Sequence, residues 1–196
     1  LESTQPDADD LKALCAALGT TSASPMLHVK GITPEADMAP TPDADHIVIA
    51  AADFAELWDK FNAGPATVDL VALGSPHFSP EECRKFAKAM KGRPVHPDVT
   101  AIITLARDSL TAITADGTAE RLRQSGVKLI TDLCWCSISE PVFPPQAKVL
   151  MTNSGKYAHY APGLSQRTVR FGSLAMCAET ACTGQAPARP PQWIVA

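Results

Sequence analysis

The sequence predicts an α/β protein: a three-layer domain with a mostly parallel sheet flanked by helices. Short, almost wholly apolar runs such as Val68–Leu73 and Ala101–Leu105 have the length and composition of strands buried on both faces of a sheet. Stretches of helical period separate these runs, so that strand and helix alternate along the chain. With 45% apolar and 19% charged residues over 196 positions, the chain can bury an adequate core.

The amino-terminal part opens with a helix. Asp9–Leu18 places apolar side chains at helical spacing, which predicts one buried face. The short apolar runs Met26–Val29 and His46–Ala50 then predict strands, and Phe54–Phe61 predicts a second amphipathic helix before the strand at Val68–Leu73. The apolar face of the first helix consists of Leu11, Leu14, Cys15 and Leu18.

The strongest local signal is the start of a helix at Ser79-Pro80-Glu81-Glu82. Serine at the N-cap, proline at the first helical position and glutamate at the third together satisfy the first free amides and complement the helix dipole. The helix carries Cys83, Phe86 and Met90 on one face and ends at Lys91–Pro94.

The alternation continues and then gives way to proline-rich sequence. A helical stretch broken at Asp116-Gly117 leads to a strand at Val127–Thr131, and a further strand is expected at Lys148–Met151. A polar turn follows, and the last helix is expected at about Ser173–Cys182.

We therefore expect one α/β domain over residues 1–186, with the only plausible internal boundary in the Pro-rich stretch near 34–45. Residues 187–196 form a Pro-rich tail that we expect to run over the surface.

Charge and hydropathy argue against several classes of function. The net charge of −4 and the lack of a long Lys/Arg cluster give no reason to expect a nucleic-acid partner. No apolar run reaches the length of a membrane span, and the segment Leu1–Thr4 lacks the basic and apolar regions of a secretory signal. We expect a cytoplasmic protein whose six cysteines are reduced and serve in the core or at a metal.

Polar residues follow three of the predicted strands, where ligands of open parallel sheets bind. These segments are 74–77, 131–136 and 152–160. The third offers backbone amides and polar side chains that suit a carboxylate or phosphate, although a solvated turn has equal odds. Asp132, in the second segment, could be an acid, a base or a loop cap. The candidates for a small-anion site are Asn153, Ser154, Lys156 and His159, with Ser75 and His77 as weaker members.

The cysteines suggest a metal. Cys134 and Cys136 are two apart after a strand, so on an extended backbone both thiols project to one side. Cys177 is the best third candidate, because the amino end of a helix favours a thiolate. Each could instead be a small buried side chain. That simpler interpretation is kept for the cysteines on apolar helix faces: Cys15, Cys83 and Cys182.

Four blocks of sequence, taken in order, resemble the large subunit of aconitase X. The resemblance extends from the first helix to about residue 186, and its third block is the most distinctive. It implies an aconitase-like fold, and it places the chain in the carboxyl-terminal half of a larger subunit. The blocks are Gly74–His77 with the helix that follows, Thr131–Cys134, Met151–Gly163 and Phe171–Cys177.

Because members of that family dehydrate small hydroxy acids, the resemblance implies a hydro-lyase. The sequences of Cys134–Cys136 and Gly155–Tyr157 resemble those of the bacterial cis-3-hydroxy-L-proline dehydratases more than those of the mevalonate 5-phosphate dehydratases. The second activity is the alternative. The resemblance also implies partners: a small hydroxy-acid substrate, the amino-terminal half of the large subunit, and a small swivelling subunit or domain. The isolated chain is then expected to be inactive and to expose an apolar patch through which it dimerises.

The resemblance further implies an iron–sulfur cluster, of the 2Fe–2S type, or a mononuclear iron, absent from an isolated fragment. Cys134 and Cys177 would be its ligands, with another from the missing half and Cys136 as a neighbour or an alternative ligand. Leu133 departs from the family pattern, where a small hydroxyl residue is expected, and this puts the surroundings of the cluster in doubt. The general base is unassigned. The residues implied for orienting the substrate or the cluster's surroundings are Ser75, His77, Asn153, Ser154 and Lys156.

Two other classes of function stay open from the residues alone. A non-catalytic module could hold a small anion at 153–159, although such a site needs no soft thiolate ligands. A hydrolase could use a cysteine nucleophile with His77 or His159 as base, although the spacing matches no known Cys–His signature.

Overall fold

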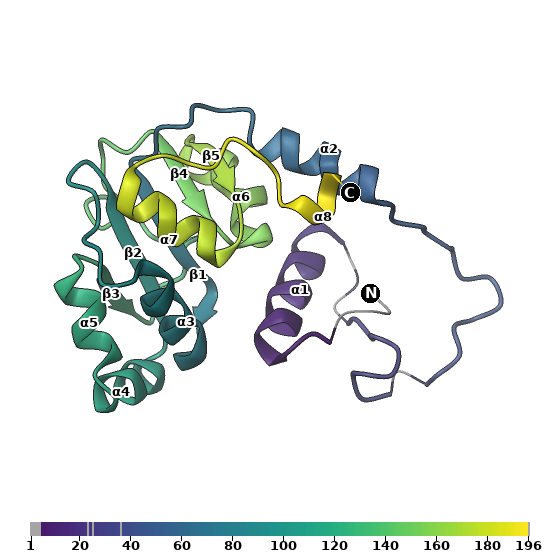
Figure 1. Cartoon of the computed structure of the whole chain (residues 1–196). Coiled ribbons are helices and arrows are strands. Elements are labelled where there is room, and N and C mark those ends of the chain that lie inside the picture. The colour runs from purple at the N-terminus through teal and green to yellow at the C-terminus, as the bar shows by residue number, and fades with distance from the viewer. Residues whose placement is uncertain (1–4, 23, 25, 36, 196) are drawn as a thin grey trace.

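A five-stranded parallel sheet with strand order β3-β2-β1-β4-β5 forms the centre of the protein (Figure 1). The computed structural model describes residues 5–22, 24, 26–35 and 37–195. The predicted class, a mostly parallel sheet flanked by helices, is confirmed. The strands are β1 (Leu70–Phe78), β2 (Thr100–Leu105), β3 (Lys128–Thr131), β4 (Val149–Thr152) and β5 (Thr168–Phe171).

Helices cover both faces of this sheet (Figure 1). One face is covered by α3 (Pro80–Met90), α4 (Arg107–Ala115), α5 (Thr118–Gln124) and α7 (Leu174–Thr183). The other is covered by α6 (Gly155–Ser165) and the loop that follows β3. Outside these layers lie α1 (Ala8–Thr21), α2 (Ala51–Phe61) and α8 (Gln192–Val195). In the described residues, no helix combines the length and apolar character needed to cross a bilayer.

Successive residues of β1 divide the core into two layers. Val71 and Leu73 pack with the α3 and α7 layer, whereas Leu70 and Ala72 pack with the α6 layer. This alternation follows from the two-residue period of a strand. The apolar residues on both faces of β1 are thus covered by helices on either side of the sheet, which confirms the prediction of a strand buried on both faces.

The predicted capping box at Ser79 is present. The Ser79 Oγ accepts from the Glu82 amide at 3.1 Å, and the Glu82 carboxylate accepts from the Ser79 amide at 2.9 Å. The predicted break at Asp116-Gly117 separates α4 from α5, with Gly117 at φ 78°. These local signals hold because they satisfy the helix termini independently of tertiary contacts.

Two predicted strands in the amino-terminal part are wrong in this structure. Residues 26–29 and 46–50 have no strand assignment, and residues 46–50 are fully on the surface. The predicted helices around them are both present as α1 and α2. A strand needs a neighbour to satisfy its backbone, and the described residues provide none here.

Three predictions in the rest of the chain also need correction. β1 continues through Gly74–Phe78, so Ser75 and His77 lie in a strand rather than a loop. The segment 152–160 is the end of β4 and the start of α6, because Ser154 caps a helix through its Oγ, which accepts from the Tyr157 amide at 3.0 Å. The tail does more than run over the surface, since Ile194 is buried and Trp193 meets Phe54 edge to face at 5.4 Å.

Strand β5 was not predicted because its sequence, Thr-Val-Arg-Phe, includes an arginine. Arg170 is nevertheless buried, and its guanidinium donates to the carbonyls of Asn62, Gly64 and Pro187 at 2.6, 2.8 and 2.9 Å. The cation thus ties the sheet edge to α2 and to the tail by satisfying carbonyls that would otherwise lack donors.

Gly74 permits the close approach of β1 and β2. Its φ of 97° is in the left-handed region, and a Cβ there would lie 2.1 Å from the Thr104 carbonyl oxygen. The Thr104 hydroxyl in turn donates to the Gly74 carbonyl at 2.7 Å. Only glycine fits at this point, after which the pairing of β1 with β2 is irregular until Phe78 pairs with Leu105.

We expect Gly74→Ala to destabilise the protein by about 2–4 kcal/mol, since it combines backbone strain with a clash against β2. The control is Gly92→Ala, at φ 71° but with open space around the added methyl group. It should cost only about 1 kcal/mol. Urea unfolding followed by circular dichroism measures both, and equal losses would show that the close approach does not matter.

Candidate functional site

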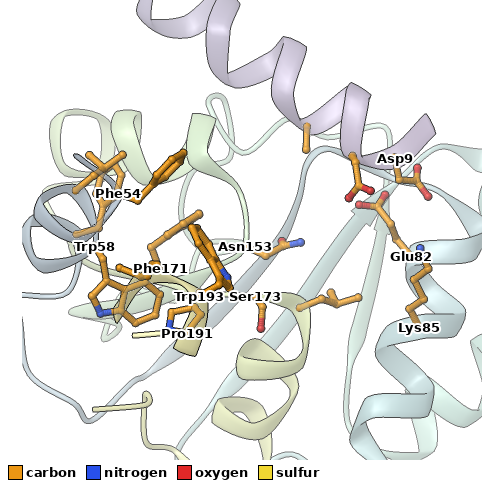
Figure 2. Close-up of a pocket in the computed structure, with 17 residues that line it drawn as sticks. Asp9, Phe54, Trp58, Glu82, Lys85, Asn153, Phe171, Ser173, Pro191 and Trp193 are labelled. Carbon is orange, nitrogen blue, oxygen red and sulfur yellow. The ribbon is translucent and has the colours of Figure 1, made fainter. Parts of the chain in front are cut away.

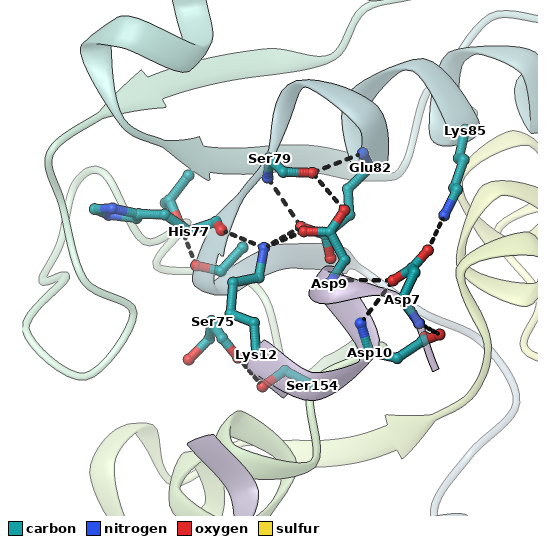
Figure 3. Close-up of polar contacts among 12 residues, drawn as sticks. Asp7, Asp9, Asp10, Lys12, Ser75, His77, Ser79, Glu82, Lys85 and Ser154 are labelled. Atoms are coloured by element: carbon teal, nitrogen blue, oxygen red, sulfur yellow. Dashed lines mark hydrogen bonds and ion pairs between the residues drawn. The ribbon is translucent and has the colours of Figure 1, made fainter. Parts of the chain in front are cut away.

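Helix α1 lies over the end of β1, held by polar contacts (Figure 3). Lys12 Nζ donates to Glu82 at 2.5 Å, to Asp9 at 2.9 Å and to the His77 carbonyl at 3.1 Å. Ser79 Oγ donates to Asp9 at 2.6 Å. None of the residues of α1 is buried. The helix is therefore attached by charge and hydrogen bonds, with little apolar burial.

Lys12 remains a cation in this network. Burial lowers the pKa of Lys12, but its hydrogen bonds to Glu82 and Asp9 outweigh burial and leave the pKa above its ordinary value. Burial raises the pKa of Glu82, and Lys12 offsets this only in part. For Asp9, burial is outweighed by the bonds from Ser79 and Lys12, so the pKa of this carboxyl is lowered. Lys12 is thus the central cation of this attachment, which also includes the Ser79–Asp9 hydrogen bond and an ion pair between Lys85 and Asp7 at 2.9 Å.

A cavity of about 440 Å³ lies on one side of α1, against α2, α7 and α8. Figure 2 shows Trp58, Phe171 and Trp193 gathered at one end and Asp9, Glu82 and Lys85 at the other. Of the predicted substrate-binding residues, Asn153 lines this cavity. An apolar wall facing a charged rim suits a small molecule with a ring and ionised groups.

A second cavity, of about 540 Å³, lies on the other side of α1. It is lined by Cys15 and Ala16 of α1 and by residues of the β3 loop and α6. Lys156, a predicted substrate-binding residue, and the predicted metal ligand Cys134 share it. The α6 and β3-loop residues that line it are Cys134, Cys136, Lys156, Tyr160 and Leu164.

The thiol loop, residues 133–137, is held by the tryptophan between its cysteines. Trp135 is buried, donates from Nε1 to the Leu73 carbonyl at 2.8 Å, and packs against Tyr157 with ring centroids 5.2 Å apart. The backbone here is a turn rather than the extended segment we expected, yet both cysteines line the second cavity. Burial and the adjoining Cys134 thiol raise the pKa of Cys136.

His77 tethers the thiol loop from the end of β1. Its Nε2 lies 2.9 Å from the Leu133 carbonyl oxygen, within hydrogen-bonding distance. Sequence reasoning assigned His77 to the substrate, whereas in this structure its ring contacts the backbone beside Cys134. The residue that departs from the family pattern, Leu133, thus contributes its carbonyl to the site.

Ser75 and Ser154 meet where β1 ends and α6 begins. The Ser154 hydroxyl donates to the Ser75 carbonyl and accepts from the Tyr157 amide (Figure 3). The Ser75 hydroxyl is buried and has no hydrogen-bond partner among the described residues. A free buried hydroxyl beside the amino end of an eleven-residue helix is suited to an anion such as a carboxylate.

Two predicted site residues lie elsewhere. Cys177 is fully buried in the layer of Val71 and Leu73, where burial raises the pKa of its thiol far above the ordinary value. Trp135 belongs to the opposite layer, so the sheet separates Cys177 from Cys134. His159 is exposed and lines a third cavity with Lys60 and Arg167. The structure therefore does not bring Cys177 or His159 to the predicted site.

An iron or iron–sulfur group fits this site only in part. Soft, adjacent thiols at Cys134 and Cys136 are suitable donors. Across the described residues, however, no three Cys, His, Asp or Glu side chains are close enough to hold a metal ion. The chain can supply two thiolates, and the remaining donors must come from elsewhere.

Sequence reasoning missed the contribution of α1. We expected its apolar face to be buried, but Leu14 is 40% exposed, and Cys15 is exposed and lines the second cavity beside Cys134. The docked face instead carries Asp9, Lys12 and Ala16. These positions recur at helical spacing, so a search for a second, polar stripe would have found them.

The fold and site define an α/β protein with a candidate ligand-binding region at the carboxyl edge of a parallel sheet. Residues 68–183 match the family model of the aconitase X third domain, and residues 1–59 match that of the aconitase X second domain. The chain belongs to the aconitase X family, which confirms the predicted resemblance. The internal boundary near 34–45 stays a prediction; the two models adjoin between 59 and 68.

Characterised relatives are longer than this chain. It is 46% identical to a cis-3-hydroxy-L-proline dehydratase of Pseudomonas aeruginosa, a match that covers 99% of this chain and 34% of the relative. It is 41% identical to the enzyme of that name from Hypocrea jecorina, with 97% and 33% covered. The crystal structure of aconitase X from Thermococcus kodakaraensis, in its holo form, superposes with a TM-score of 0.81 at 27% identity, covering 91% of this chain and 46% of that one. The chain thus spans about a third of the length of these curated relatives, at 34% and 33%.

We expect Lys12→Met to loosen α1. The change leaves Glu82 partly buried without its cation and should weaken docking of α1 by about 1–2 kcal/mol. Amide exchange across α1 should then be roughly 5- to 30-fold faster. Because the pKa of Lys12 is raised by docking, its contribution is present below the unfolded pKa and is lost as pH rises through the folded pKa.

The matched control is Lys88→Met on the exposed side of α3, which removes the same charge. Hydrogen exchange measured by mass spectrometry should show no change in α1 for this control. Unchanged exchange in Lys12→Met would mean that apolar contacts hold the helix.

We expect the cysteines to differ sharply in reactivity. Cys15 and Cys134 are exposed, whereas Cys83 and Cys177 are buried, and burial raises the pKa of Cys83 to about 12. A maleimide at neutral pH should therefore label Cys134 at least about 100-fold faster than Cys177. Peptide mass spectrometry identifies the sites. Equal labelling would mean that α7 opens readily and would return Cys177 to the set of accessible ligands.

Proposed function

We propose that the complete protein is a hydro-lyase that eliminates water from a small hydroxy acid, cis-3-hydroxy-L-proline, and that this chain supplies part of its active site. The observation that carries the proposal is a juxtaposition at one edge of the sheet. The thiol pair Cys134 and Cys136 shares a cavity with Lys156, and Lys156 lies in the first turn of the helix that Ser154 caps beside Ser75. The similarity to two cis-3-hydroxy-L-proline dehydratases supports the substrate class.

Ser75, Lys156 and the first amides of α6 bind the substrate carboxylate in this proposal. Elimination removes the proton α to that carboxylate and expels the hydroxyl from the neighbouring carbon, so negative charge builds up on the carboxylate side. Donors already fixed around the carboxylate stabilise this charge without reorganising. Asn153 helps to orient the substrate ring in this proposal. It lines the first cavity, called the aromatic cavity because Trp58, Phe171 and Trp193 line one end of it.

We propose that Cys134 and Cys136 hold an iron or iron–sulfur group together with donors from outside this chain. When bound, the iron supplies a Lewis acid for the departing hydroxyl. Trp135 and His77 keep the two thiols in position through their bonds to the Leu73 and Leu133 carbonyls. For Cys177 to serve as a ligand, α7 would have to leave the core.

The partners in this proposal are the amino-terminal half of the large subunit and a small swivelling subunit or domain. These would supply the general base and the missing iron ligands, so the isolated chain is inactive. A cytoplasmic location agrees with the free thiols. A phosphate would suit the amino end of α6 as well as a carboxylate does, so mevalonate 5-phosphate is the second substrate to test.

The test is anaerobic iron reconstitution of this chain with both partners, followed by iron analysis and dehydratase assays on both substrates. We expect activity on cis-3-hydroxy-L-proline only in the full assembly, with iron binding and activity both lost in Cys134→Ser. Cys182→Ser, at a half-buried thiol on the same chain, is the control and should retain both. Full activity without iron in Cys134→Ser would favour the anion-binding or cysteine-hydrolase alternatives.

Ser75→Ala tests the carboxylate site separately. Its hydroxyl has no partner in the described chain, so its loss should change the free energy of unfolding by less than about 0.5 kcal/mol. Activity should fall by about 10-fold or more, as expected when a hydrogen bond to a charged substrate is lost. An unchanged kcat/KM would remove Ser75 from the site.

A further inference from the structure

Residues 46–49 have the composition of a buried strand but lie in solvent. Ile47, Val48 and Ile49 are 84%, 87% and 67% exposed. Among the described residues, no backbone hydrogen bond joins 46–49 to any other segment. Three consecutive β-branched side chains favour a strand, and an exposed apolar strand invites pairing with another chain.

Other residues of the amino-terminal part also expose apolar side chains. Met26 is 70% exposed, and Leu14 on the outer face of α1 is 40% exposed. All of these residues lie within 1–59, the part that matches the second-domain family model. In Figure 1, residues 37–50 run away from the sheet, whereas the elements after residue 68 pack together around it. The amino-terminal part thus exposes apolar surface that the rest of the chain does not cover.

The pattern of side chains indicates which kind of strand this is. In a strand, Ile47 and Ile49 point to one face and Val48 to the other, so both faces are apolar. Such a strand is typical of a sheet that is covered on both faces, where the interior strands are the most apolar. Ala50 ends it, because its amide donates to Asp53 at 2.7 Å in the cap of α2.

We propose that residues 46–49 form an interior β-strand in a sheet completed by the amino-terminal half of the family's large chain, with residues 26–29 as a second strand of that sheet. The partner is taken from the proposed function, on which this inference therefore rests. The chain covers only 34% of its Pseudomonas relative, and its matches are to second and third domains, so the relatives contain further sequence to provide these neighbours.

A second copy of this chain is a poorer partner. Asp43 and Asp45 precede the strand and Asp53 follows it, and no basic residue lies between 43 and 53 apart from His46. Two copies paired through this strand would bring carboxylates of like charge together. A partner of different sequence avoids that repulsion.

Docking at this strand would also act on the site. The strand runs directly into α2, whose Phe54 and Trp58 line the aromatic cavity. Fixing residues 46–49 therefore fixes the start of α2 and one wall of that cavity. The inferred contact links assembly of the large subunit to the shape of the pocket beside Asn153.

The test compares backbone amide exchange at 46–50 in the isolated chain and after coexpression with the portion of the Pseudomonas dehydratase that precedes its matched region. We expect these amides to be unprotected in the isolated chain and at least about 100-fold slower in the complex. Val48→Pro removes a donor that an interior strand needs and should abolish the complex, with the urea midpoint of the isolated chain unchanged. Ala39→Pro, in the same exposed segment, is the control and should allow the complex to form.

Several outcomes would overturn the inference. Concentration-dependent protection of the isolated chain would assign the strand to a second copy. A complex with no protection at 46–50, or one that tolerates Val48→Pro, would remove the strand from the interface even if the assembly is an active dehydratase. Protection in an assembly that contains all partners but lacks dehydratase activity would support this interface while contradicting the proposed function.

Discussion

The carboxyl end of β1 is the part of the structure on which the rest of the site depends. The backbone carbonyls of three alternate residues each accept a hydrogen bond from a different segment. Leu73 accepts from Trp135 of the thiol loop, Ser75 from Ser154 at the start of α6, and His77 from Lys12 of α1. The close approach at Gly74 begins an irregular stretch of pairing between β1 and β2, which runs from Leu73 to Phe78 and contains these carbonyls. A change in the path of β1 would therefore move the thiols, the helix terminus and α1 together.

The sequence predicted the third-domain part well because its signals are local. The capping box at Ser79 and the break at Asp116-Gly117 satisfy backbone groups within a few residues. The sequence was a poorer guide where the structure depends on contact with another segment. Residues 26–29 and 46–50 have strand composition, but a strand forms only against a neighbour. The polar segment 152–160 resembled a loop because several of its polar side chains lie on the solvent side of α6.

The candidate site residues also divide into those whose position follows from local sequence and topology and those whose position depends on tertiary packing. Ser75 lies near the carboxyl end of β1, and Ser154, Lys156 and Cys134 follow strands, so all four reach the carboxyl edge, as the topology of parallel sheets requires. Cys177 does not, because helical position alone cannot tell which side of the helix meets the core. Cys15 shows the reverse: it was assigned to an apolar face, and tertiary packing turned it toward the thiols.

Helix α1 joins the two family domains through charge rather than apolar burial, and this has a physical consequence. A contact made by Lys12, Asp9 and Glu82 can break and reform without exposing a core, whereas the α3 and α7 layer cannot. The two cavities lie on either side of α1, so any movement of this helix changes both at once. Thiols tethered by Trp135 and His77 on one side and a polar, separable helix above them suit the proposed dehydratase site, which would have to exclude water and then open to release product.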